Sequence, residues 1–215
     1  MPKLTESQQE MRRTRILDAA EICFARTGFH RTTMQDICRE AGVSAGAVYI
    51  YFDSKEALIE GISTRSREEV LEAFEKLRQP QDFALALGQV MQECILSRPA
   101  YKSILWLEIS AEATRNSAIS ATHHNCEQHV SEELVTLLEG ASREGRIAPV
   151  LPIPDIVAAM MVIADGLFLR RAVDPQFDAA ATGQTILTML AGLIHPVMAQ
   201  PAVATSNDRT AAEAV

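Results

Sequence analysis

Apolar residues recur every three or four positions along most of this chain, which is the period of a helix with one buried face. The clearest early example occupies positions i, i+3, i+4, i+7 and i+8 of one stretch: Ile16, Ala19, Ala20, Cys23 and Phe24. Gly28 follows at the place expected for a left-handed residue that ends a helix. No pair of stretches alternates as paired strands do, so the pattern predicts an all-α chain.

Two short helices are predicted directly after this first one. Thr33 is expected to cap the second helix, and Asp36 three residues later completes a capping-box pattern. Gly42 makes the turn, and Ser44 caps a third helix that ends near Phe52. Two short helices joined by a glycine turn are typical of a helix-turn-helix, whose second helix enters the major groove of DNA.

Long helical stretches make up the rest of the chain. Asp53 is expected to cap a fourth helix, with Glu56 at its third position, and apolar residues continue until Pro80. Five further helices are predicted over residues 81–97, 99–114, 117–146, 155–172 and 178–199. From residue 200 the chain is small and polar, so we expect a disordered tail after about nine helices.

Composition and charge refine this picture. Of the 215 residues 47% are apolar, which is enough to bury a sizeable core. The net charge is −8, but residues 1–55 hold 8 Lys and Arg against 7 Asp and Glu, whereas residues 56–215 hold 12 against 21. An acidic body therefore carries a nearly neutral head, unlike a small and strongly basic architectural DNA-binding protein.

Several classes of site and location are disfavoured by residue spacing. Four widely separated cysteines without a C-x-x-C pair argue against a disulfide scaffold or a zinc finger. The polar N-terminus has no signal-peptide stretch, and polar residues interrupt the uncharged stretch 179–200, so we expect a cytoplasmic protein without a membrane span. No histidine follows a glutamate by three residues, as a di-iron enzyme in a helical bundle would require, and we expect no enzyme and no cofactor.

The third helix has chemistry that suits DNA binding. Tyr49, Tyr51 and Lys55 are expected to reach phosphate oxygens, with Thr32, Thr33 and the Arg12, Arg13 and Arg15 cluster on the other side. The alternative is an ordinary helical head with half-buried tyrosines and a solvated lysine. The string A-G-V-S-A-G-A-V-Y-I-Y-F-D-S-K-E-A-L, preceded by A-R-T-G-F and T-T-M-Q-D-I, favours the first interpretation. It resembles the DNA-binding signature of the tetracycline-repressor (TetR) family over residues 12–71.

The resemblance implies roles for individual residues. Thr33, Tyr49, Tyr51 and Lys55 would contact the DNA backbone. Five residues would face base edges: Gln35, Ser44, Ala45, Gly46 and Ala47. Alanine at both 45 and 47 departs from many relatives and offers only methyl contact, so base recognition would depend on Gln35, Ser44 and DNA shape.

The last two predicted helices are apolar nearly all round, which suggests burial against a second copy of the chain. We expect a four-helix bundle across a two-fold axis, with Met161 and Leu190 inside it. The alternative is that both helices lie in the core of one protomer. The body also resembles the ligand-binding domains of the TetR family, particularly the branch with an Asp-Gly pair in the eighth helix, here Asp165-Gly166.

The middle helices and the fourth helix are expected to enclose a ligand pocket. Its candidate lining is Phe83, Met91, Trp106, Met160, Met161, Asp165 and Phe168, although such residues at helical spacing also suit a plain core. Asp165 needs a partner if it is buried, so it is either part of a packing salt bridge or a ligand anchor. The predicted domains are a DNA-binding domain over 1–54, a ligand-binding and dimerisation domain over 55–199, and a tail over 200–215.

His123, Cys126 and His129 are residue types that bind zinc or copper. Steps of three residues drift by about 60° around a helix, so the three do not share one tight face. Partly exposed polar residues on a long helix are the simpler interpretation. The function expected overall is a repressor that a small-molecule effector releases from a palindromic operator, with an activator or a metal-responsive regulator as alternatives.

Overall fold

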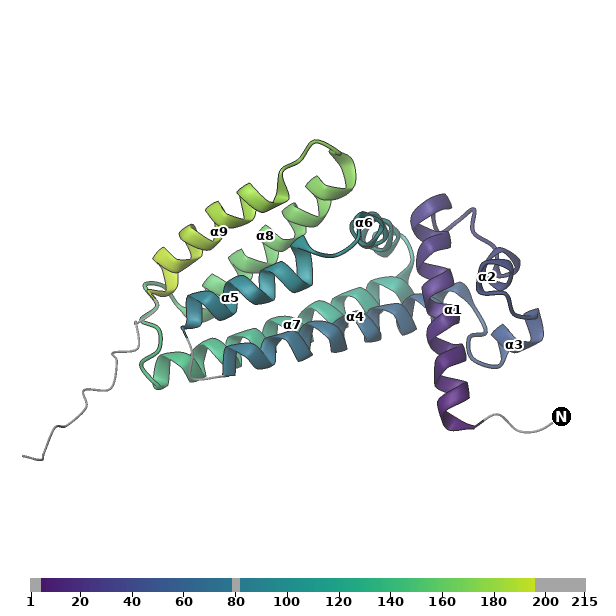
Figure 1. Cartoon of the computed structure of the whole chain (residues 1–215), viewed down its shortest axis with the longest axis horizontal. Helices are drawn as coiled ribbons and strands as arrows, with labels where there is room; N and C mark the ends of the chain where they lie inside the picture. The colour runs from purple at the N-terminus through teal and green to yellow at the C-terminus, as the bar shows by residue number, and fades with distance from the viewer. Residues whose placement is uncertain (1–4, 79–81, 196–215) are drawn as a thin grey trace, which may run out of the picture.

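The computed structural model describes residues 5–78 and 82–195, and this part of the chain consists of helices joined by turns and loops, with no strand (Figure 1). The elements are α1 (Glu6–Thr27), α2 (Met34–Ala41), α3 (Ala45–Tyr49), α4 (Lys55–Arg78), α5 (Phe83–Met91), a π-helical segment (Gln92–Leu96), α6 (Ala100–Ala113), α7 (Ser117–Arg143), α8 (Ile153–Val173) and α9 (Ala179–Ile194). The all-α prediction is confirmed. The helix end expected at Pro80 and the tail over 200–215 lie outside the described residues.

The head consists of α1, α2 and α3, and α1 stands across the ends of α4 and α7 (Figure 1). Its core is made by fully buried side chains of all three helices, among them Leu17, Ile37 and Val48. Leu58 and Ile59 from the first turns of α4 join the same cluster. Because the start of α4 packs with the head, the structure does not divide the chain at residue 54. The domain boundary expected there stays a prediction.

The start of α4 corrects one capping prediction. The helix begins at Lys55, and the Ser54 hydroxyl accepts a hydrogen bond from the Ala57 N–H at 3.1 Å. Ser54 is therefore the N-cap, and Asp53 lies one residue outside the helix. The third helix also ends earlier than expected, at Tyr49, and the chain continues to Phe52 as a turn.

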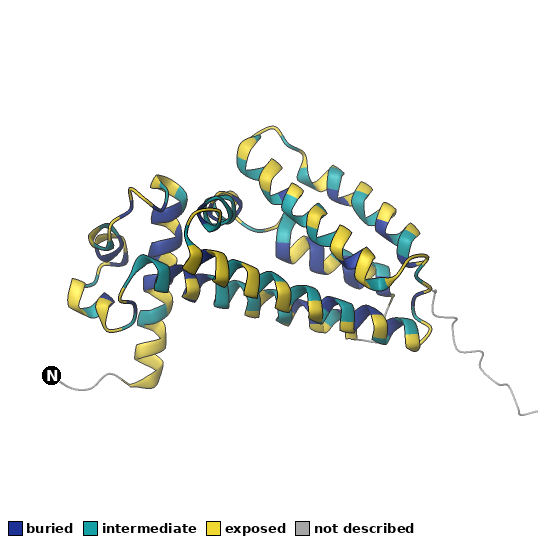
Figure 2. Cartoon of the chain, turned by 180° about the vertical axis from the view of Figure 1, so that it is seen from behind, coloured by how far each residue is buried: buried dark blue, intermediate teal, exposed yellow. Residues whose placement is uncertain are grey.

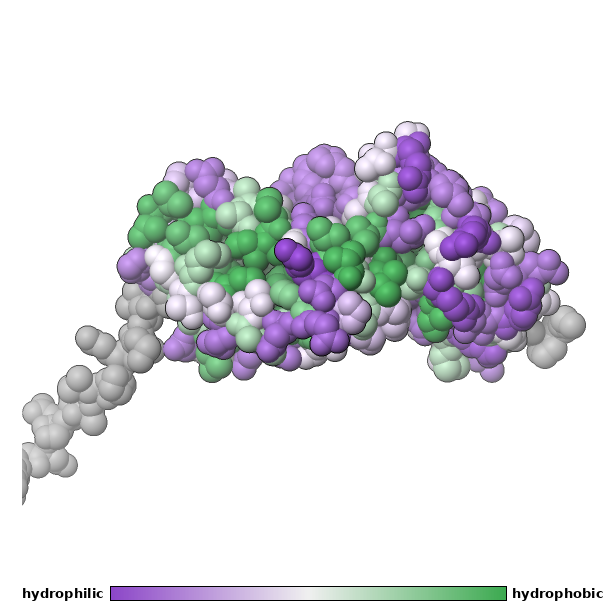
Figure 3. All heavy atoms as spheres, turned by 90° about the horizontal axis from the view of Figure 1, so that it is seen from above, coloured by the Kyte–Doolittle hydropathy of each residue, from purple (hydrophilic) through white to green (hydrophobic). Residues whose placement is uncertain are grey.

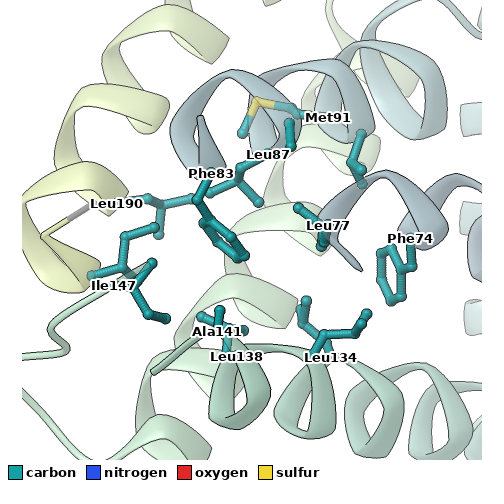
Figure 4. Packing of buried hydrophobic residues seen from close by; sticks show 14 of the residues in the cluster. Phe74, Leu77, Phe83, Leu87, Met91, Leu134, Leu138, Ala141, Ile147 and Leu190 are labelled. Atoms are coloured by element: carbon teal, nitrogen blue, oxygen red, sulfur yellow. The ribbon is translucent and has the colours of Figure 1, made fainter. Parts of the chain in front are cut away.

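The body is built on α4 and α7, which run side by side along its length (Figures 1 and 2). α5, α8 and α9 cover them, and α6 lies between this bundle and α1. Figure 4 shows the packed interior, which includes Phe74, Leu77, Phe83, Leu138 and Leu190. Each such side chain contributes roughly 1.5–3 kcal/mol when it is fully buried, so this cluster holds the body together.

The predicted helix over 81–97 contains an irregularity that its sequence did not indicate. After Met91 the chain forms a π-helical turn, which the Ser97 N–H closes by donating to the Gln92 carbonyl at 2.8 Å. The Arg171 guanidinium on α8 donates to the Ile95 and Arg98 carbonyls and fixes the segment from outside. Such bulges occur mostly at functional sites, which draws attention to the space beside it.

The proline-rich loop before α8 is held against the end of α9. The Ala148 N–H donates to the Ile194 carbonyl at 2.9 Å, and the Val150 N–H donates to the Leu193 carbonyl at 3.0 Å.

Within residues 5–78 and 82–195, no helix combines the length and the apolar character needed to cross a lipid bilayer.

Candidate nucleic-acid interface and internal cavity

The helix-turn-helix is built by side chains that cap both of its helices. Thr33 Oγ1 accepts from the Asp36 N–H, and the Asp36 carboxylate accepts from the Thr33 N–H at 3.0 Å, so the expected capping box is present. Gly42 adopts a left-handed conformation (φ 62°), which a glycine takes without strain, and the chain turns there. The Ser44 hydroxyl then accepts from the Ala47 N–H and begins α3.

The outer surface of α3 is made of small residues. Ser44, Ala45 and Gly46 are exposed, and a Cβ at Gly46 would meet no atom within 4 Å. Val48 holds the opposite side of the helix in the core of the head. In the described part of the chain nothing covers this outer surface, so the backbone of α3 is accessible to a large partner such as a duplex.

Other predicted DNA contacts lie on neighbouring surfaces of the head. Thr33 and Gln35 are exposed at the start of α2, and Tyr49 is exposed at the end of α3. Ala47 and Tyr51 are half-buried, and Tyr51 packs against the core of the head. That these five residues touch DNA stays a prediction.

Lys55 has an internal role that its sequence context did not show. Its ammonium donates to the Phe29 carbonyl at 2.5 Å and lies 4.3 Å from the centre of the Phe29 ring. The His30 carbonyl is a second, weaker acceptor at 3.5 Å. Lys55 therefore fixes the turn between α1 and α2, and any phosphate contact that it makes adds to this internal role.

Two residues that were expected on the other side of the groove, Thr32 and Arg15, differ in their exposure. Thr32 is buried and its hydroxyl donates to the Gly28 carbonyl at 2.7 Å and the Cys23 carbonyl at 3.1 Å, so the prediction that it faces DNA is wrong. Arg15 is exposed and donates to the Gly42 carbonyl at 3.3 Å, which places its positive charge beside the turn.

The body contains an apolar cavity of about 250 Å³ that is partly open to solvent. This is larger than the ~150 Å³ cavity that is known to bind benzene, so a small organic molecule fits. Side chains from α4 to α9 and from the π-helical segment line the cavity, among them Val70, Phe74, Leu87, Cys94, Val130 and Met160. The cavity thus lies directly beside the π-helical bulge.

A few polar side chains interrupt this apolar lining. Asp165 of α8 faces His123 and Glu127 of α7, and the His123 Nε2 lies 3.5 Å from the Glu127 carboxylate. Burial raises the pKa of the Asp165 carboxyl above its usual range, and the negative charge of Glu127 raises it further. Nearby, the Trp106 and Phe168 rings stack with centroids 5.4 Å apart.

One wall of the cavity is an ion-pair cluster that joins the head to the body. Glu21 of α1 is only 2% exposed, and its carboxylate accepts from Lys102 of α6 at 2.6 Å and from Arg65 of α4 at 2.7 Å. Arg65 also pairs with the exposed Asp18 at 2.7 Å. Glu21 and Lys102 themselves line the cavity, so a molecule inside it lies against this cluster.

A second set of contacts connects α6 to the turn between α1 and α2. The Glu108 carboxylate accepts from the Phe29 N–H at 2.5 Å. The buried Glu112 pairs with His30 at 2.9 Å and with Arg115 at 2.7 Å. α6 therefore holds the head at two places, namely along α1 and at the turn that leads into the helix-turn-helix.

Two family models match the chain in the order of these two parts. The model described as bacterial regulatory proteins, tetR family, matches residues 16–62, and the model described as BetI-type transcriptional repressor, C-terminal, matches residues 97–195. The chain belongs to the TetR family. It is a DNA-binding transcriptional regulator, and regulators of this family bind operator DNA and form dimers with ligand-binding C-terminal domains.

Individual TetR-family relatives match nearly the whole chain. UidR of Escherichia coli is 27% identical over 191 residues, which cover 88% of this chain and 96% of UidR. TtgR of Pseudomonas putida is 28% identical over 186 residues, which cover 79% and 84% of the two chains. Both relatives are HTH-type transcriptional regulators.

Solved structures of the family show the same fold. Salmonella enterica GusR is 29% identical, with a TM-score of 0.71 over 90% of this chain and all of GusR. NalD, the secondary repressor of the MexAB-OprM multidrug efflux pump in Pseudomonas aeruginosa, has a TM-score of 0.67 at 23% identity and covers 86% of this chain and 98% of NalD. At that identity the likeness to NalD concerns the fold alone.

Most of the predicted pocket residues of this regulator line the cavity. Met91, Trp106, Met160, Met161, Asp165 and Phe168 all border it. Phe83 does not, because it is buried in the core under the Arg146 guanidinium, which lies 5.6 Å from its ring centre. Asp165 does not form the packing salt bridge that was one of its two expected roles. Within residues 5–78 and 82–195 its carboxylate makes neither an ion pair nor a hydrogen bond.

The structure does not bring together His123, Cys126 and His129, the residues of the metal-responsive alternative. The His123 ring points to Ser110, with 3.2 Å between Nε2 and Oγ, whereas His129 Nδ1 lies 2.7 Å from the Asn125 carbonyl. The Cys126 thiol donates to the Ser63 carbonyl. Within the described ranges, no group of three or more His, Cys, Asp or Glu side chains is arranged to hold a metal ion, and nothing favours the metal-responsive alternative.

Sequence reasoning missed the carboxylates that join head and body. One signal was present for Glu21, since it occupies the apolar face of α1 together with Leu17, Ala20 and Phe24. A carboxylate at such a position requires a buried partner. Glu108 and Glu112 gave no comparable signal, because their partners lie about 80 residues earlier in the chain.

Proposed function

We propose that this regulator is a repressor that binds a two-fold symmetric operator as a dimer and releases it when a small molecule occupies the cavity. It acts by binding alone, without catalysis, in the cytoplasm where the operator lies. The observation that supports this most directly is that Glu21 and Lys102 belong both to the cavity wall and to the contact between α1 and α6.

Release requires that the effector binds one arrangement of the heads better than the other. α4 was expected from the sequence to be the connecting element. It does extend from Lys55 at the head to Phe74 at the cavity, but α6 offers a second connection through Lys102 and Glu108. A shift of either helix changes the position of the head, and a coupling of about 1–3 kcal/mol is typical.

An exposed apolar face on α8 and α9 supports dimerisation through these two helices. Val162 is 70% exposed, and Leu169, Val173 and Met189 are exposed as well. Figure 3 shows hydrophobic side chains gathered on the face of the body where α8 and α9 lie. An apolar face of this kind favours burial against an equivalent face across a two-fold axis.

The residues expected inside the dimer bundle are only partly suited to that role. Leu190 is 2% exposed and belongs to the core of its own protomer, so a charge placed there would unfold the protomer instead of reporting on the interface. Met161 faces the cavity. The exposed positions of the same helices, beginning with Val162, are the appropriate ones.

The proposal is tested with the full-length protein and the DNA upstream of its own gene. A thermal-shift screen of small molecules identifies a stabilising compound, and fluorescence anisotropy then measures operator affinity with and without it. We expect the compound to weaken operator binding about fivefold to 150-fold. Tight binding of the compound in the cavity with unchanged operator affinity would contradict the proposed release.

A matched pair of variants links that response to the cavity. Val130→Trp fills the cavity from α7, whereas Gln128→Trp places the same side chain on the exposed side of α7. We expect Val130→Trp to lose most of the response to the compound and Gln128→Trp to keep it. Circular dichroism checks that both variants are folded, since overpacking alone typically costs about 1–3 kcal/mol.

A further inference from the structure

Among the charged groups that line the cavity, Asp165 stands apart because it has no partner. Arg98 pairs with Glu69 at 2.9 Å, and Lys102 pairs with Glu21 at 2.6 Å. Over residues 5–78 and 82–195 no cation and no hydrogen-bond donor reaches the Asp165 carboxylate. Arg98 and Lys102 are thus already paired with carboxylates, whereas the half-buried Asp165 carboxylate has no such ion pair.

The surroundings of Asp165 add negative charge to this part of the cavity. Glu127 faces it from α7, and the His123 Nε2 lies 3.5 Å from the Glu127 carboxylate and 3.2 Å from the Ser110 hydroxyl oxygen. Two carboxylates therefore lie near one imidazole, which contacts Glu127 but forms no hydrogen bond with Asp165. In this corner of the cavity neither carboxylate pairs with a Lys or Arg of the described residues, whereas most of the remaining lining is apolar.

An aromatic pair lies next to the same corner. Phe168 follows Asp165 by three residues, so the two side chains lie on one side of α8 and both border the cavity. Phe168 stacks on Trp106, which precedes Ser110 by one turn of α6. Faces of aromatic rings attract cations, and tryptophan does so most strongly.

We propose that the cavity selects a cationic amphiphile, whose ammonium group is held between Asp165, Glu127 and the Trp106–Phe168 pair while its apolar part fills the rest of the cavity. This inference rests on the proposed role of the cavity as the effector site. A neutral ligand would displace solvent from the half-buried Asp165 carboxylate without offering it a partner. An anion would need Arg98 or Lys102 to leave its existing ion pair, and it would face two carboxylates.

Three probes of one shape test the charge preference without any variant. They are 6-phenylhexyltrimethylammonium, its neutral tert-butyl analogue and the carboxylate of the same chain length, each titrated calorimetrically into the full-length dimer. We expect the cation to bind about tenfold or more tighter than the neutral analogue, and the carboxylate to bind weakest. Equal binding of cation and neutral analogue, or preferred binding of the carboxylate, would overturn the proposal.

Variants then assign the preference to the two carboxylates. Asp165→Asn should lower the affinity for the cation about tenfold or more while that for the neutral analogue changes little, and Glu127→Gln should have a smaller effect in the same direction. Glu139→Gln is the control, since Glu139 is an exposed carboxylate of α7 outside the cavity. If Asp165→Asn leaves the ratio of the affinities for the cation and the neutral analogue unchanged, Asp165 does not anchor the cation.

Operator binding separates this inference from the proposed function. If the cation binds with the expected preference but leaves operator affinity unchanged, the ligand class stands and the release mechanism fails. If only a neutral or anionic compound binds and releases the operator, the release mechanism stands and the cationic class is wrong.

Discussion

The Glu21 side chain connects three helices, α1, α4 and α6, through ion pairs. It is buried on α1 and accepts from Arg65 of α4 and Lys102 of α6, both of which are largely buried as well. Glu21→Gln leaves two poorly solvated cations facing a neutral amide, so we expect a loss of about 2–4 kcal/mol in the free energy of unfolding. Urea denaturation measures this loss.

Asp18 supplies the matched control for Glu21. It contacts the same Arg65 at the same 2.7 Å, but its side chain is 58% exposed. Asp18→Asn should therefore cost less than about 1 kcal/mol, because solvent screens exposed pairs. If the two variants lose the same free energy of unfolding, the burial of Glu21 does not strengthen the contact between head and body.

Asp165 should lower the stability of the unliganded protein. Because burial raises its pKa in the folded state, the folded protein binds this proton more tightly than the unfolded chain does. The carboxyl therefore costs nothing below the unfolded pKa of about 3.9, and its cost grows as pH rises from there to the folded-state pKa and stays constant above it. We expect Asp165→Asn to raise Tm by about 1–4 °C at neutral pH.

The pH dependence provides the check on this explanation. The gain in Tm for Asp165→Asn should shrink as pH falls toward the ordinary range of an aspartic acid. Glu127 and His123 face the same carboxyl, so Glu127→Gln should reduce the gain in Tm from Asp165→Asn at neutral pH. A gain that stays constant from neutral to acidic pH would point to packing instead of charge.

At the scale of a helix, the two residues before α4 are a direct test of capping. Ser54→Ala removes the acceptor for the Ala57 N–H and should cost about 1 kcal/mol in the free energy of unfolding. Asp53→Ala, one residue earlier, should cost less than about 0.5 kcal/mol. Thermal unfolding of both variants at one pH decides between the two caps.

The helices differ in how well their sequences predict them. The caps at Thr33 and Ser44 were predictable because both use local contacts within four residues. The cap of α4 was not, because Asp53 and Ser54 are both good cap residues and sequence alone does not choose between them. The π-helical turn is contacted by Arg171, which lies about 75 residues later in the chain, and no local pattern indicated it.

The cavity shows a second limit of sequence analysis. Helical spacing identified the apolar sides of α5 and α8, but it does not distinguish side chains that border a cavity from those that fill a core. Met91 and Phe83 lie on the same short helix, yet Met91 borders the cavity and Phe83 packs in the core. The difference arises from the packing of other helices around them.

For the whole molecule, the apolar face of α8 and α9 leads to a prediction about assembly. Val162→Glu places a charge at an exposed position that has no role in the core of the protomer. We expect this variant to remain folded, to become monomeric in light scattering, and to lose operator affinity, because one head contacts only one half-site.

An equivalent change elsewhere on the surface serves as the control. Val150 is a similarly exposed valine in the loop before α8, and Val150→Glu should leave the dimer and its operator affinity intact. A dimer that survives Val162→Glu would place the interface on another face of the body.

The π-helical turn beside the cavity also has an evolutionary consequence. A π bulge amounts to one residue inserted into an α-helix, and each inserted residue rotates the following side chains by about 100°. Related regulators that retain a regular helix here should align with this chain through a one-residue gap near Gln92–Leu96. Such a gap would mark branches whose cavities differ in shape, even where the lining residues themselves are the same.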